Sequence, residues 1–231
     1  MNGYFSKSEW ALWGGSVGAV LLAFFAFDGA EYLTLVASLI GVTSLIFNAK
    51  GNPIGQLLMV VFSLLYGFIS YSFSYYGEMV TYLGMTGPMA LFALIAWLRH
   101  PYKGRRAQVA VNRLTAGEWV FALLLTGVVT AAFYFILAAF HTAYLPLSTL
   151  SVTTSFLAVY LTFRRSPWFA LVYAGNDVVL ILLWVLATAQ NPAYLSVVVC
   201  FAVFLVNDVY GFVNWRRMCR RQAENSPRGI A

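Results

Sequence analysis

Hydrophobic side chains fill eight long stretches of this chain, and short polar segments separate them. Each stretch holds 18 or more residues, and about 20 helical residues cross a bilayer core of about 30 Å. Only a helix or a closed barrel satisfies its own backbone in that environment. The pattern therefore predicts eight membrane-spanning helices, with approximate bounds 10–27, 31–48, 53–75, 79–98, 117–140, 143–163, 167–188 and 193–215.

Lysine and arginine occupy every second connection between these stretches. The basic connections hold Lys7, Lys50, the segment 99–113, Arg164 with Arg165, and the segment 216–221. The other connections, around Asp28, Glu78, His141 and Asn191, hold neither lysine nor arginine. Basic loops stay on the cytoplasmic side of a membrane. The alternation therefore predicts a multi-pass protein with both termini in the cytoplasm.

Composition excludes a separate soluble domain. Hydrophobic residues make up 61% of the chain, charged residues only 10%, and the mean hydropathy is +0.77. The net charge of +6 is explained by loops beside anionic lipid headgroups, so the expected partner is membrane lipid and not nucleic acid. Cys200 and Cys219 have no metal-binding spacing and predict no disulfide.

Two parts of the chain carry corresponding landmarks, which indicates a duplication. Pro53 and Pro167 begin helices 114 residues apart, and Trp97 and Trp215 precede basic clusters 118 residues apart. Both triplets of helices begin on the outside, so the pattern predicts parallel repeats related by an axis along the membrane normal. The predicted organisation is an extra N-terminal helix (1–30), a first three-helix repeat (31–100), a basic loop with a linker helix (101–142), a second three-helix repeat (143–217) and a cytoplasmic tail (218–231).

Two sequence strings carry a resemblance to a known family. The first is Tyr76-Gly77-Glu78-Met79, followed by Pro88 and Trp97. The second and more specific string is Phe204-Leu205-Val206-Asn207-Asp208-Val209-Tyr210-Gly211-Phe212-Val213-Asn214-Trp215. On these residues the chain resembles the PnuC family of vitamin transporters, from about residue 30 to residue 217.

The resemblance implies an all-α integral membrane fold, with a SWEET-like pair of three-helix bundles joined by one helix. It also implies a homotrimer in the bacterial inner membrane. Family members import nicotinamide riboside by facilitated diffusion, and a cytoplasmic kinase phosphorylates the substrate and so traps it. Relatives are assigned to thiamine or deoxynucleosides. The expected substrate is nicotinamide riboside, and the alternative is a related nucleoside or vitamin.

One departure from the family pattern bears on the substrate. Many nicotinamide riboside carriers place a Trp-x-x-Trp pair on the penultimate helix, ahead of an aspartate. Here Tyr173 and Ala170 stand four and seven residues before Asp177. This branch either holds the same vitamin in another way or holds another nucleoside.

Buried polar residues on the seventh span predict a binding site. A charged side chain inside a bilayer costs about 2.5 to 3.5 kcal/mol on insertion scales, so Asp177 and Asp208 need a reason to be there. Tyr173, Asp177 and Trp184 follow one helical face, and Asn176 adjoins it. Aromatic faces suit a flat or cationic ring, and carboxylate or amide acceptors suit a ribose.

The eighth and third spans add further candidates. Asn207, Tyr210 and Asn214 form a polar stripe at i, i+3 and i+7, and Gln56 and Tyr66 lie on the repeat-related side. Polar residues in helix bundles also connect helices by hydrogen bonds. This stripe therefore has two alternative interpretations, ligand binding and helix packing. The predicted substrate-binding set is Gln56, Tyr66, Tyr173, Asn176, Asp177, Trp184, Asn207, Tyr210 and Asn214.

Motifs for catalysis, metal binding and phosphate-cradling loops are absent from the sequence. We therefore expect no enzyme, no catalytic residue, no metal and no cofactor. Three other classes remain as alternatives: a proton-coupled carrier, an intramembrane enzyme using Asp177 and Asp208, and a receptor or assembly subunit without flux. Within the fourth predicted span, Gly84, Gly87 and Pro88 mark a place where a helix can bend.

Overall fold

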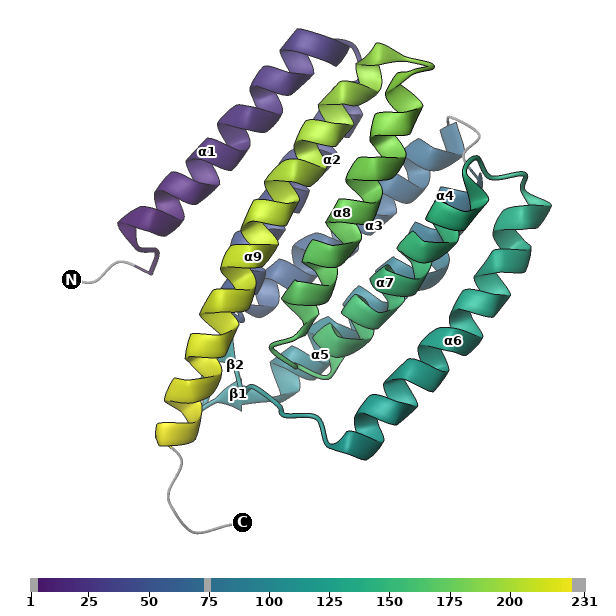
Figure 1. Cartoon of the computed structure of the whole chain (residues 1–231). Helices are drawn as coiled ribbons and strands as arrows, with labels where there is room; N and C mark the ends of the chain where they lie inside the picture. The colour runs from purple at the N-terminus through teal and green to yellow at the C-terminus, as the bar shows by residue number, and fades with distance from the viewer. Residues whose placement is uncertain (1–3, 73–75, 226–231) are drawn as a thin grey trace.

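The fold is seen in a computed structural model that describes residues 4–72 and 76–225 (Figure 1). In this part of the chain, eight helical segments are long and apolar enough to cross a membrane, which confirms the predicted all-α membrane architecture. The α-helices are α1 (Lys7–Ala23), α2 (Tyr32–Ala49), α3 (Pro53–Ser72), α4 (Tyr76–Thr81), α5 (Gly87–Arg99), α6 (Ala116–Ala139), α7 (Leu145–Phe163), α8 (Phe169–Thr188) and α9 (Leu195–Glu224). The shorter segments are π-helices η1 (Phe24–Asp28) and η2 (Tyr82–Thr86) and 3₁₀-helix η3 (Pro192–Tyr194).

Two spans depart most clearly from their predicted form. The fourth span is α4, η2 and α5 in series, because the π-helical turn at Tyr82–Thr86 interrupts the α-helix. Helix α9 runs to Glu224, about two turns beyond the predicted end at residue 215, because arginine ends a hydrophobic span but favours helix. The predicted end of the third span, at residue 75, lies outside the described residues.

A short β-hairpin follows α5 in the basic connection. Strand β1 (Pro101–Tyr102) pairs in antiparallel fashion with β2 (Arg105–Val109). Lys103 and Gly104 form the turn with positive φ angles of 49° and 73°, a conformation that glycine adopts without cost. The Val109 amide donates to the Gly51 carbonyl at 2.9 Å, so the hairpin is fixed against the α2–α3 turn.

The first triplet consists of α2, α3 and the α4–η2–α5 span, and the second consists of α7, α8 and α9. The two triplets pack in the same order. Helix α3 packs against α2 and α5, and α8 packs against α7 and α9. Between the triplets, α2 packs against α9, and α5 packs against α7. Helix α1 lies beside α9 and α2 at one edge of the bundle, whereas α6 lies beside α7 at the opposite edge (Figure 1).

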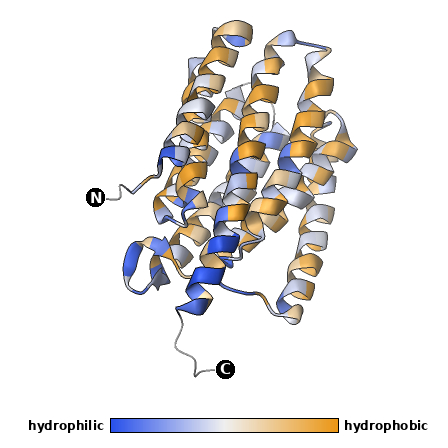
Figure 2. Cartoon of the chain, turned by 60° about the vertical axis from the view of Figure 1, so that its left-hand side comes forward, coloured by the Kyte–Doolittle hydropathy of each residue, from blue (hydrophilic) through white to orange (hydrophobic). Residues whose placement is uncertain are grey.

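Polar residues mark one end of the bundle. Figure 2 shows hydrophilic residues gathered at the hairpin and at the C-terminal part of α9, while the helices above them carry mostly hydrophobic side chains. Helices α1 and α6 both begin near this end with capping boxes, in which Ser6 pairs with Glu9 and Thr115 pairs with Glu118. We call this end, which carries the hairpin and the basic connections, the basic face.

Candidate functional site

A central cavity of about 420 Å³ lies between the two helix triplets. Side chains from α2, α3, α4, α7, α8 and α9 line it, and so do the π-helical residues Tyr82 and Thr86. It reaches the face opposite the basic face, where His141, Thr142 and Gln190 contribute to its wall. A largely apolar cavity with a few polar groups is the form that small-molecule sites take.

Two carboxyl groups from neighbouring helices meet in this cavity. Asp177 on α8 is 3% exposed and Asp208 on α9 is 5% exposed, and both side chains line the cavity. One carboxyl oxygen of Asp177, Oδ2, is buried and has no hydrogen-bond partner among the described residues. Buried polar atoms are normally satisfied, so this oxygen is an acceptor at the cavity wall that still lacks a donor.

Asn176 is held in place by three hydroxyl groups of α7. Its Oδ1 accepts from Thr154 Oγ1 at 2.7 Å, from Ser155 Oγ at 3.1 Å and from Ser151 Oγ at 3.3 Å. These bonds occupy the amide oxygen and leave the Nδ2 group as the donor for a ligand. The amide is buried and its orientation is fixed before any ligand binds.

Aromatic rings form the wall of the cavity on the side of α3. The Tyr66 ring lies 4.7 Å from Phe62 and 5.1 Å from Tyr82, centroid to centroid. Phe204 of α9 extends this cluster at 6.3 Å from Phe62. Across the cavity, Tyr173 of α8 packs edge-on against Phe169 at 6.2 Å. Facing aromatic surfaces of this kind can hold a flat ring between them.

The outer end of the cavity carries a third carboxylate. Glu78 of α4 lines it together with Tyr76, and Trp184 of α8 packs against Tyr194 of η3 at 5.2 Å. Gly77 allows α4 to approach the α6–α7 turn closely, because a Cβ there would lie 2.6 Å from Thr142 Oγ1. The fourth span thus brings a titratable carboxyl group to the mouth of the cavity.

At the end near the basic face, two tryptophans seal the bundle. Trp97 of α5 and Trp215 of α9 are both fully buried, and their rings lie 5.4 Å apart. Trp97 Nε1 donates to the Thr162 carbonyl of α7 at 2.9 Å, and Trp215 Nε1 donates to the Asn48 carbonyl of α2 at 2.7 Å. Each tryptophan therefore ties the last helix of one triplet to the first helix of the other.

A polar pair lies just above this seal. Gln56 of α3 donates to Asn48 Oδ1 at 2.8 Å, and both side chains are buried and line the cavity. Gly55 is required beside them, since a Cβ there would lie 2.2 Å from Asn48 Oδ1. Of the nine residues predicted for the site, six line the cavity: Gln56, Tyr66, Tyr173, Asn176, Asp177 and Trp184.

The polar stripe of α9 does not line the cavity, which corrects the expectation that it faces the stripe of α8. Asn207 Nδ2 donates to Ser16 Oγ at 2.8 Å, Tyr210 donates to Glu9 at 3.0 Å, and Asn214 donates to the Ala49 carbonyl at 2.7 Å. The stripe therefore packs against α1 and the end of α2, where its hydrogen bonds connect helices.

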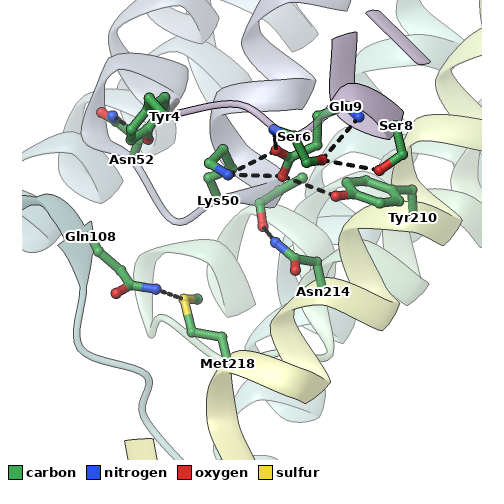
Figure 3. A network of polar contacts seen from close by, with 11 residues as sticks. Tyr4, Ser6, Ser8, Glu9, Lys50, Asn52, Gln108, Tyr210, Asn214 and Met218 are labelled. Atoms are coloured by element: carbon green, nitrogen blue, oxygen red, sulfur yellow. Dashed lines mark hydrogen bonds and ion pairs between the residues drawn. The ribbon is translucent and has the colours of Figure 1, made fainter. Parts of the chain in front are cut away.

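Figure 3 shows the polar cluster around Tyr210. Glu9 accepts from Tyr210 and forms an ion pair with Lys50 at 2.8 Å. The Lys50 ammonium also lies over the rings of Tyr4 and Phe5, at 5.0 and 5.5 Å from their centroids. These contacts fix the start of α1 against α2 and α9. The sequence pattern of the α9 stripe does not by itself identify α1 as the helix that it contacts.

We expect Asn207→Ala to lower stability without changing ligand affinity. The substitution removes the buried hydrogen bonds to Ser16 and to the Val203 carbonyl, a loss of about 1 to 3 kcal/mol. Asn176→Ala is the matched comparison, because it deletes the same amide inside the cavity. Thermal unfolding and ligand titration of both purified variants test this, and weakened binding in Asn207→Ala alone would contradict the assignment.

Asn48 and Glu78 are cavity residues absent from the predicted set. Both stand at the ends of predicted spans, where asparagine and glutamate are ordinary boundary residues. In the sequence, the family-like string Tyr76-Gly77-Glu78-Met79 is the feature that points to a role for Glu78. The α7 hydroxyls that hold Asn176 carry a weaker signal, since Ser151 and Ser155 share one helical face.

The chain matches the nicotinamide mononucleotide transporter family over residues 31–217. It is 27% identical over 222 residues to a protein named nicotinamide riboside transporter PnuC from Neisseria mucosa (strain ATCC 25996 / DSM 4631 / NCTC 10774 / M26), covering 94% of this chain and 83% of the relative. It is 22% identical over 192 residues to the protein of the same name from Haemophilus influenzae (strain ATCC 51907 / DSM 11121 / KW20 / Rd), covering 83% and 82% of the two chains.

A solved structure has the same fold. The crystal structure of the vitamin B3 transporter PnuC superposes with a TM-score of 0.81 at 25% sequence identity, covering 96% of this chain and 95% of that one.

Proposed function

This chain belongs to the nicotinamide mononucleotide transporter family, and from that premise we propose that it imports nicotinamide riboside by facilitated diffusion. Members of this family are transporters and not enzymes. The observation that carries the substrate proposal is the central cavity, in which a buried carboxyl pair meets facing aromatic walls. The two relatives named as nicotinamide riboside transporters support the same substrate.

Nicotinamide riboside matches the cavity in chemistry. Its flat nicotinamide ring carries a positive charge, which aromatic faces attract by about 0.5 to 2 kcal/mol. Its ribose hydroxyls can donate to the free Oδ2 of Asp177 and accept from Nδ2 of Asn176. We propose that Gln56, Tyr66, Tyr173 and Trp184 complete the contact set.

Transport requires the cavity to open alternately to each side, and the two helix triplets are the proposed moving bodies. Their equivalent internal packing, and the equivalent contacts of α2 with α9 and of α5 with α7, support the duplication into residues 31–100 and 143–217. The Trp97 and Trp215 bonds join the triplets at the basic face. They support a conformation that is closed toward that face.

The basic connections support a cytoplasmic location for the basic face and both termini. Nicotinamide riboside would then enter from the outer face of a bacterial inner membrane and be trapped by phosphorylation inside. A homotrimer is part of the proposal, and chemical cross-linking in membranes tests it.

Glu78 provides a separate test of the cationic substrate. We expect Glu78→Gln to weaken nicotinamide riboside binding about tenfold, because a carboxylate at the cavity mouth attracts the positive ring. Binding of the reduced, uncharged riboside should change less than about twofold. Isothermal titration measures both, with Glu31→Gln on an exposed turn of the same face as control. Equal losses for the two ligands would argue against a charge interaction.

Titration of the purified protein with nicotinamide riboside, thiamine and a deoxynucleoside tests the substrate itself. The proposal expects selective binding of the riboside. Binding of one of the other ligands by folded protein, without riboside binding, would leave the carrier function in place and change the assigned substrate.

A proton-coupled mechanism is the second candidate, because the Asp177–Asp208 pair can also relay protons. It predicts that an uncoupler abolishes uptake even when no substrate is being phosphorylated, and uptake that the uncoupler leaves unchanged would exclude it.

A further inference from the structure

A second pocket, of about 360 Å³, lies at the basic face and shares no lining residue with the central cavity. Four separate parts of the chain contribute to it: the segment before α6, the first turn of α6, the α7–α8 turn and the last turns of α9. We call it the arginine pocket. Its lining residues are Arg113, Leu114, Trp119, Ser166, Pro167, Trp168, Arg216, Cys219 and Arg220.

The charge of this pocket is entirely positive. Arg113, Arg216 and Arg220 line it, and no aspartate or glutamate does. Among the described residues, none of the three guanidinium groups lies within ion-pair distance of a carboxylate. The nearby Glu118 is already paired with Arg164. Three arginines without a counter-ion create a local excess of positive charge that an anion can neutralise.

The three arginines are exposed, and the pocket differs from an ordinary basic surface in having an aromatic and apolar wall beside them. The Arg216 guanidinium lies 5.3 Å from the centre of the Trp168 ring, and that ring packs on Phe212 at 5.6 Å. Leu114, Trp119 and Pro167 form further apolar wall. Arg216 is therefore supported by a ring that is itself packed, while the apolar wall offers contact for the carbon portion of a ligand.

The chemistry of the pocket fits a phosphate group. Guanidinium groups donate parallel pairs of hydrogen bonds to phosphate oxygens, and they do so with fixed planar geometry. The pocket also lies at the membrane boundary, because α7 ends at Phe163, α8 begins at Phe169 and α6 begins at Ala116. Lipid phosphates lie at this level, and basic pockets between membrane helices bind such headgroups.

We propose that the arginine pocket is a phosphate-binding site, which takes the headgroup phosphate of an anionic phospholipid or the phosphate of a soluble compound. A bound phosphate would bridge α9 to the segment before α6 and to the α7–α8 turn. The site is independent of the transported substrate, because it lies apart from the central cavity.

Native mass spectrometry of the purified full-length protein with phosphatidylglycerol tests the lipid source. We expect the combined variant R113Q/R216Q/R220Q to retain this lipid at least about tenfold less than the wild type. The matched control is R99Q/R105Q/R106Q, which removes three arginines of the same face that are equally exposed but lie outside the pocket. Phosphatidylcholine, whose phosphate is neutralised by its own choline, should bind weakly to all three proteins.

Titration calorimetry with inorganic phosphate, against sodium chloride at equal ionic strength, tests the soluble source. Phosphate binding that the pocket variant loses and the control keeps would assign the site to soluble phosphates. The proposal is overturned if the two triple variants lose phosphatidylglycerol equally, or if neither probe binds in a pocket-dependent way. Should the pocket triple variant unfold, as judged by thermal unfolding, R113Q and R220Q alone are each expected to weaken binding by severalfold.

Discussion

Asp177→Asn is expected to reduce nicotinamide riboside uptake about 100-fold in reconstituted vesicles. The substitution keeps the size of the side chain but replaces one carboxyl oxygen with an amide donor at the cavity wall. Leaving a buried polar group without its partner costs about 1 to 3 kcal/mol, and the upper part of that range corresponds to a loss of this size. Because the free Oδ2 of Asp177 is buried, water cannot replace the lost interaction cheaply.

Binding and uptake should fall together in this variant. Initial uptake rates in proteoliposomes and calorimetric affinity are the two measurements. Asp28→Asn is the matched control, since Asp28 lies at the end of η1, remote from the cavity lining, and we expect it to transport normally. Uptake within about twofold of the wild type in Asp177→Asn would remove Asp177 from the site.

The combined variant Trp97→Phe and Trp215→Phe is expected to open the cavity toward the basic face. It keeps two aromatic rings but removes both indole donors to the Thr162 and Asn48 carbonyls. A net loss of about 2 kcal/mol from the closed state changes the ratio of the two conformations about 30-fold. Uptake should fall at least about tenfold, because the transporter then spends little time open to the outside.

A cysteine reporter separates this change from simple unfolding. Val159 lines the cavity on α7, one turn before Thr162, so Val159→Cys in a background lacking Cys200 and Cys219 can be labelled through an opened seal. We expect faster labelling by a membrane-impermeant reagent applied to the basic face. Trp10→Phe, at an exposed position of α1, is the control. Unchanged labelling together with lower thermal stability would mean that the tryptophans serve packing alone.

The membrane architecture could be predicted from the sequence because each span is encoded locally. About 20 apolar residues must form a helix in a bilayer, whatever their neighbours are. The buried carboxylates could be located for a similar reason, since the cost of Asp177 in a membrane does not depend on knowing its partners. Asn176 and Tyr173 then followed from helical spacing.

The polar stripe of α9 was misplaced because periodicity gives the face of a helix and not the helix that it meets. Asn207 and Tyr210 share a face, but the neighbour is α1, through Ser16 and Glu9. Asp208, one residue further on, turns toward the cavity instead. Helix α9 thus contacts α1 with one face and lines the cavity with another.

Features at the ends of spans were also difficult to predict. Asn48 and Glu78 lie where hydropathy changes, so they resemble boundary residues. Their place in the cavity depends on the close packing permitted by Gly55 and Gly77. The β-hairpin arises from a turn at Lys103 and Gly104 within a basic segment, and membrane hydropathy carries no information about such a turn.

Counterflow in proteoliposomes tests the central claim most directly. Vesicles containing the purified protein are loaded with unlabelled nicotinamide riboside and diluted into labelled riboside, with equal pH and equal ions on both sides. The account predicts rapid, saturable accumulation of label that empty vesicles and Asp177→Asn vesicles lack. No accumulation above that of empty vesicles, in a preparation that exchanges a deoxynucleoside or thiamine, would contradict it.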